Sequence, residues 1–146
     1  MRPYLLDANV LIALAWPAHI HHGMAHKWFA EKSRNGWATC PLTECAFVRF
    51  SSNPRVVADA VTPHEAISLL KRVVSLPRHI FWPDEFSLVN LRHVPSHLLG
   101  GHNQINDAYL LSLAISRKGR IATLDKGFLS LLPQGDSNRS AVELIG

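Results

Sequence analysis

The chain has 146 residues, about the size of one domain, and it is 47% hydrophobic and 18% charged, which excludes a disordered protein. Its longest apolar run, residues 10–16, is far shorter than the roughly 20 residues of a membrane-spanning helix, and its two cysteines are too few for a disulfide framework. Lys and Arg exceed Asp and Glu by 15 to 11, a formal net charge of +4 that is compatible with a polyanionic partner such as nucleic acid. We therefore expect one cytoplasmic domain over residues 1–146 with no membrane segment.

The first half of the chain alternates short apolar segments with segments of helical periodicity. Residues 4–6 and 37–40 are short apolar runs that predict buried strands. Residues 10–15, 21–34 and 42–50 predict helices; Asn35 and Gly36 end the second of these, and Pro41 opens the third. A turn cluster at residues 51–54 ends the third helix.

The second half continues the alternation. Thr62, Pro63 and Glu65 form a capping signature for a helix that runs to about Val74. Strands are predicted at residues 79–82, 120–124 and 140–145, a short helix at 88–92, a loop at 95–103, and the strongest helix at 105–118. Short strands alternating with helices of this length indicate βαβ units, so the expected fold is α/β with a parallel sheet.

Four carboxylates fall where an unpaired charge is costly. Asp7 follows the first strand and Asp125 the fourth, whereas Glu44 and Asp107 lie within apolar helical segments near their starts. Because residues just past the ends of parallel strands converge on one edge of the sheet, we expect these four side chains to share a ligand-binding crevice. The other carboxylates are interpreted as solvated or capping residues: Glu31, Asp59, Glu65, Asp84, Glu85, Asp136 and Glu143.

Such a crevice requires a cation, because a close pair of like charges costs about 4 kcal/mol at an effective dielectric of about 20. No Lys or Arg adjoins Asp7 or Asp107 in the sequence, although Arg49 and Lys126 are possible neighbours in space. Oxygen ligands favour Mg²⁺ or Mn²⁺, which lower the pKa of a bound water that attacks a phosphodiester.

Neutral oxygen atoms also lie near the predicted crevice. Asn9 and Thr123 are placed to contact a carboxylate, a water or the metal shell. For Asp7 and Asp125 taken one at a time, capping of the following helix is an equally good interpretation.

Four segments occur in order over nearly the whole chain: Leu5-Leu6-Asp7-Ala8-Asn9-Val10-Leu11-Ile12, Thr43-Glu44, Asn106-Asp107-Ala108-Tyr109-Leu110 and Ala122-Thr123-Leu124-Asp125-Lys126-Gly127-Phe128. Together they resemble the PIN-domain nucleases and, within them, the VapC-type toxins of bacterial toxin–antitoxin pairs. The resemblance implies a Rossmann-like α/β/α sandwich around a central parallel sheet, and Mg²⁺- or Mn²⁺-dependent endoribonuclease activity on structured RNA.

The resemblance also implies roles for particular residues and partners. Asp7, Glu44 and Asp107 match the catalytic metal ligands, Asp125 matches a fourth acid, and Asn9 and Thr123 match supporting polar positions. A homodimer and a cognate VapB-like antitoxin are implied as well.

Two other functions are considered. A non-catalytic PIN-like binding module would act through dimer and antitoxin contacts and would need no metal. A phosphatase of the HAD type is disfavoured because it requires a second aspartate two residues after the first, where this chain has Asn9.

Three further groups of residues have competing interpretations. His22 and His26 have an i, i+4 spacing that can chelate zinc but lack a third ligand, and with His19 and His21 they are interpreted as lining the RNA approach or a solvated helix edge. Cys40 and Cys45 are interpreted as packing residues rather than nucleophiles. Trp16 and Trp82, each followed by proline, are candidates either for base stacking or for hydrophobic packing.

Overall fold

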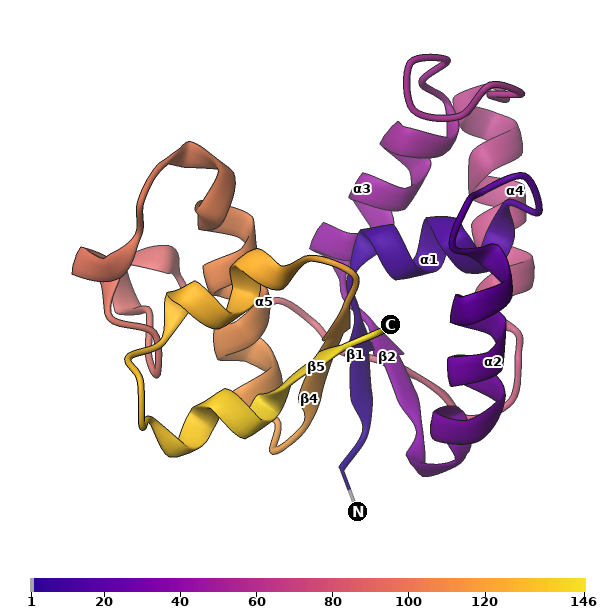
Figure 1. Ribbon diagram of the computed structural model, residues 1–146. Helices are drawn as coiled ribbons and strands as arrows, with labels where there is room; N and C mark the ends of the chain where they lie inside the picture. Colours follow the sequence, from indigo (N-terminus) through magenta and orange to yellow (C-terminus); the bar gives the residue numbers. More distant parts are fainter. Residues whose placement is uncertain (1) are drawn as a thin grey trace.

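A five-stranded parallel sheet forms the centre of the computed structural model, which describes residues 2–146 (Figure 1). The strands are β1 (Tyr4–Leu6), β2 (Trp37–Thr39), β3 (His79–Phe81), β4 (Arg120–Thr123) and β5 (Val142–Leu144), in the order β3-β2-β1-β4-β5. The helices are α1 (Ala8–Ala15), α2 (His22–Lys32), α3 (Pro41–Ser51), α4 (Pro63–Val74) and α5 (Ile105–Ser116). Helices α1 to α4 lie on one side of the sheet and α5 lies on the other, which makes three layers (Figure 1).

The alternation of side chains along the strands builds two cores. In β1, Leu5 points toward α5, whereas Tyr4 and Leu6 point toward the other four helices. In β4, Ile121 and Ala122 divide in the same way. The central strands β2, β1 and β4 are buried on both faces, as is usual in parallel sheets, whereas the edge strands β3 and β5 are partly exposed.

The strand order places a topological switch point between β1 and β4. From β1 the chain moves outward to β2 and β3, and then returns to add β4 on the free side of β1. Loops leaving β1 and β4 therefore diverge at the carboxyl edge of the sheet, which leaves a crevice between them. Asp7 and Asp125 lie on these two loops.

The parallel sheet and the main elements confirm the predictions, with small differences at the boundaries. The predicted helix at 88–92 is a single 3₁₀ turn, Leu88–Asn90, and the predicted loop at 95–103 contains two such turns. The last strand is shorter than predicted because residues 137–141 form a 3₁₀ turn, which begins where the Asp136 carboxylate accepts a hydrogen bond from the Asn138 backbone N–H at 2.8 Å. The capping box of Thr62 and Glu65 opens α4 as predicted.

Trp82 and Trp16, the two candidates for base stacking or hydrophobic packing, have different environments in the fold. Trp82 is 4% exposed and packs in the core beside α5, so the base-stacking alternative is wrong for it. Trp16 packs against the other core, and its indole N–H donates to the Ser51 hydroxyl at 3.1 Å. Among the helices of residues 2–146, none has both the length and the apolar character needed to cross a membrane.

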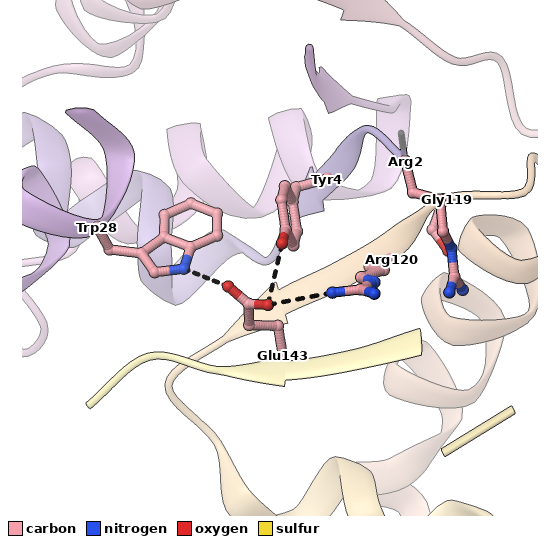
Figure 2. A network of polar contacts seen from close by, with 6 residues as sticks. All are labelled: Arg2, Tyr4, Trp28, Gly119, Arg120 and Glu143. Atoms are coloured by element: carbon pink, nitrogen blue, oxygen red, sulfur yellow. Dashed lines mark hydrogen bonds and ion pairs between the residues drawn. The ribbon is translucent and has the colours of Figure 1, made fainter. Parts of the chain in front are cut away.

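Glu143 is the centre of a polar network that holds β5, an edge strand, to the rest of the fold (Figure 2). Its carboxylate accepts hydrogen bonds from the Tyr4 hydroxyl at 3.0 Å and from the Trp28 indole N–H at 2.6 Å, and it pairs with Arg120 at 3.5 Å. The interpretation of Glu143 as a solvated or capping residue is wrong, because its side chain is only 20% exposed and contacts α2, β1 and β4.

Candidate active site

Asp7 is a buried carboxylate at the switch point, with 8% of its surface exposed. It is the N-cap of α1, since its Oδ1 accepts a hydrogen bond from the Ala8 backbone N–H at 2.8 Å. Its Oδ2 accepts a hydrogen bond from the Thr123 hydroxyl at 2.7 Å. These two bonds favour the charged form, but burial outweighs them and raises the pKa of Asp7 above its usual value.

Thr123 and Asn9 connect the loops that follow β1 and β4. The Thr123 oxygen, besides donating to Asp7, accepts the Asp125 backbone N–H at 3.0 Å and lies 3.4 Å from the Asn9 amide nitrogen. The Asn9 amide oxygen accepts the Leu124 backbone N–H at 3.3 Å. Both residues predicted to be supporting positions therefore contact the acidic loops directly.

Asp107 approaches the same place from the first turn of α5. Its pKa is raised to about 7, first by burial and then by the negative charges of Asp7 and Asp125. A cavity of about 110 Å³ has Asp7 and Asp107 in its wall, together with Arg49 from α3. Three carboxylates from three separate parts of the sequence thus repel one another, with Arg49 as the cation beside two of them.

Asp125 has one further contact that defines its local role. Its Oδ1 accepts the Gly127 backbone N–H at 2.8 Å, so it caps the 3₁₀ segment Lys126–Leu131. The capping interpretation of Asp7 and Asp125 therefore holds for both residues. It does not compete with the shared site, because a carboxylate oxygen that accepts one hydrogen bond still has a second lone pair.

Glu44 points in another direction. Its Oε2 accepts a hydrogen bond from the Thr39 hydroxyl at 2.7 Å, and the same hydroxyl lies 2.7 Å from Nε2 of His79. Since the hydroxyl proton is used on Glu44, the His79 ring donates to Thr39, and burial lowers the pKa of His79. The structure brings Asp7, Asp107 and Asp125 together and places Glu44 on the β2–β3 side, so its role as a ligand stays a prediction.

The donor chemistry of the three aspartates fits a hard divalent cation. All their free donors are carboxylate oxygens, and the mutual charge effect on Asp107 shows that a positive charge there would be stabilising. Within residues 2–146, no set of three or more His, Cys, Asp or Glu side chains is spaced closely enough to hold a metal ion. The carboxylates of Asp7, Asp107 and Asp125 are thus further apart than the ligands of a bound metal ion would be.

His22, His26 and Cys40 have structural contacts, whereas Cys45 is exposed, so the interpretation of Cys45 as a packing residue is wrong. The His22 and His26 rings lie 2.8 Å and 2.9 Å from the carbonyl oxygens of Ala13 and Leu14, in the last turn of α1, where helix carbonyls lack partners. Cys40 is buried, and burial raises the pKa of its thiol to about 11, so it stays protonated and is a poor nucleophile.

Comparison with known proteins identifies the family. The PIN domain family matches residues 4–131. The chain therefore belongs to the PIN domain family. Ribonuclease VapC39 of Mycobacterium tuberculosis is 45% identical over 121 residues, covering 83% of this chain and 87% of that protein. Ribonuclease VapC38 of the same species is 43% identical over 141 residues, 97% of this chain and 96% of its own length. Within its family the protein is of the VapC type, as the four sequence segments predicted.

Solved structures agree with the fold. The crystal structure of VapBC2 from Rickettsia felis, bound to a DNA fragment from their promoter, matches with a TM-score of 0.62 and 17% identity over 99% of both chains. The crystal structure of VapC20 from Mycobacterium tuberculosis, a Sarcin-Ricin loop cleaving toxin, matches with a TM-score of 0.63 and 14% identity over 86% of this chain and 92% of that one. At these identities the likeness establishes the fold alone, and it confirms the predicted α/β PIN-like sandwich.

Proposed function

We propose that this protein is a Mg²⁺- or Mn²⁺-dependent endoribonuclease, the toxin of a toxin–antitoxin pair, which cleaves phosphodiester bonds in structured RNA. The observation that carries the proposal is the convergence of Asp7, Asp107 and Asp125 at the switch point, where burial and then the charges of Asp7 and Asp125 raise the pKa of Asp107. The ribonuclease names of the VapC39 and VapC38 relatives support the same chemistry.

The three aspartates are the residues that would hold the metal, and Glu44, whose side chain contacts Thr39 here, is the further predicted ligand. When bound, such a cation polarises a phosphoryl oxygen and lowers the pKa of a water molecule. The chain's own groups prepare the site for it: Thr123 fixes one oxygen of Asp7, and the α1 backbone fixes the other. Arg49, in the wall of the same cavity, is placed to attract a phosphate to an otherwise acidic crevice.

The proposed partners are an RNA substrate, a cognate VapB-like antitoxin and a second copy of the chain, in the cytoplasm. The VapBC2 structure from Rickettsia felis supports an antitoxin partner. Several large apolar side chains are exposed, among them Ile20, Ile67 and Val89, which is consistent with contact surfaces. The non-catalytic binding module remains the alternative, and it differs in requiring no carboxylate chemistry.

The test is cleavage of total RNA by purified, antitoxin-free protein with Mg²⁺ or Mn²⁺, with EDTA, and with single variants of the acids. Asp7→Asn and Asp107→Asn are expected to abolish discrete cuts, and Glu44→Gln tests the residue that lies apart. Asp59→Asn is the matched control, because Asp59 is exposed and lies away from the acidic cavity. Circular dichroism establishes that each variant folds. Cuts that persist in EDTA or in Asp7→Asn would refute the proposal.

A further inference from the structure

A second hollow adjoins the acidic cavity on the side of β3. Its volume is about 290 Å³, and its wall is made by Leu42, Asp84, Leu88, Ile105, Asn106 and Tyr109. Leu42 and Asn106 also belong to the wall of the acidic cavity, so the two hollows are neighbours that share two residues. A nucleotide with its phosphate near the aspartates would therefore have its base within reach of this second hollow.

The wall suits a flat heterocycle. Leu42, Leu88 and Ile105 supply apolar surface, and Tyr109 supplies an aromatic ring. That ring is held in place, since the Tyr109 hydroxyl donates to the Phe86 carbonyl at 3.0 Å and the two rings stack with centroids 4.6 Å apart. Unpaired RNA bases are commonly bound by this combination of apolar contact and a fixed aromatic ring.

Asp84 gives the hollow a selective polar group. Its carboxylate lies in the same wall as the Tyr109 ring. Burial raises the pKa of Tyr109, and the negative charge of Asp84 adds to this effect. A carboxylate can only accept hydrogen bonds, and it can accept two in parallel. Among the four RNA bases, guanine alone presents two adjacent N–H groups, N1–H and N2–H, on its Watson–Crick edge.

We propose that this hollow, which we call the base pocket, binds an unpaired guanine next to the scissile phosphate, with Asp84 accepting from N1–H and N2–H. The Asn106 amide, at the border of the two hollows, is placed to meet the remaining polar edge of the base. This inference rests on the proposed function for its substrate class; Asp84 is exposed, as its interpretation as a solvated residue predicts, and the proposal adds base binding to that position.

The experiment measures binding without cleavage. Short fluorescent oligouridines carrying one central guanosine, inosine or adenosine are titrated with the whole protein in EDTA, and anisotropy gives the Kd. Inosine lacks the N2 amino group, so it tests one of the two proposed hydrogen bonds. We expect about tenfold weaker binding of the inosine oligonucleotide, and weaker binding still of the adenosine one.

Two variants complete the test. Asp84→Asn is expected to bind the three oligonucleotides within about twofold of one another, because an amide offers one acceptor in place of two. Asp59→Asn is expected to keep the wild-type order, since it removes an equal charge from another exposed site. Equal binding of guanosine and adenosine by the wild type, or an unchanged guanosine preference in Asp84→Asn, would overturn the proposal. If the protein prefers guanosine but cuts no RNA in the presence of metal, the nuclease function is refuted and the base-pocket proposal is still supported.

Discussion

Replacing Asp107 with Asn is expected to stabilise the metal-free protein above neutral pH. Folding raises the pKa of this carboxyl from 3.8 to about 7, through burial and the charges of Asp7 and Asp125. At 1.36 kcal/mol for each pKa unit, keeping Asp107 charged in the folded state costs roughly 4 kcal/mol. Because the side chain is only partly buried, solvent screening reduces this to roughly 2 kcal/mol.

The sign of the effect follows from proton binding. Folded Asp107 holds its proton more tightly than the unfolded chain does, so below about pH 4 both states are protonated and the group costs nothing. The cost grows as the pH rises from about 4 to about 7, and it is complete above that. An asparagine carries no charge at any pH, so Asp107→Asn avoids this cost and raises the free energy of unfolding most at alkaline pH.

Thermal unfolding in EDTA at pH 5 and pH 8, followed by circular dichroism, measures the difference. At pH 8 the Tm of Asp107→Asn is expected to exceed that of the wild type by about 4–8 °C, with a clearly smaller gain at pH 5. Added Mg²⁺ should narrow or reverse the difference, since it binds the wild type more tightly. A variant that is less stable than the wild type at pH 8, or equally stabilised at both pH values, would refute the reasoning.

Three further substitutions test other parts of the structure by urea denaturation. Thr123→Val removes the hydroxyl that donates to Asp7, which should cost about 1–3 kcal/mol, and Thr123→Ser should restore most of it; a neutral Thr123→Val would contradict the contact. Gly119→Ala should cost about 1–3 kcal/mol because a Cβ would lie 2.7 Å from the Pro3 carbonyl oxygen, whereas Gly101→Ala, with open space around it, should be nearly neutral. Phe47→Ala should cost about 3–5 kcal/mol, since its ring is fully buried, and a loss below 1 kcal/mol would show that the core collapses around the cavity.

Local signals in the sequence predicted most of the fold. The capping box of Thr62 and Glu65 and the period of the apolar positions depend on residues a few places apart, and both were confirmed. The placement of Asp7 and Asp125 at one edge also followed from the sequence, because the carboxyl ends of parallel strands converge whatever the details of packing.

The features that the sequence did not predict depend on distant partners. Glu143 finds Trp28 and Tyr4 more than a hundred positions away, so nothing near it in the chain indicates that its carboxylate is largely buried. The direction of the Glu44 side chain likewise depends on Thr39 and, through it, on His79 from the neighbouring strand. Asp84 follows Trp82 and Pro83 in the sequence, and only the fold places it in the same wall as Tyr109, from α5.

The network around Glu143 has a practical consequence for how this domain is cut from the chain. The family match ends at residue 131, before β5 begins at Val142, yet β5 pairs with Ile121, Ala122 and Thr123 of β4. A fragment trimmed to the family boundary would leave the outer backbone groups of β4 without partners, forming an open edge on which other copies can add strands. Residues 142–144 therefore cover the edge of β4 against strand addition, and expression fragments should keep residues 132–146.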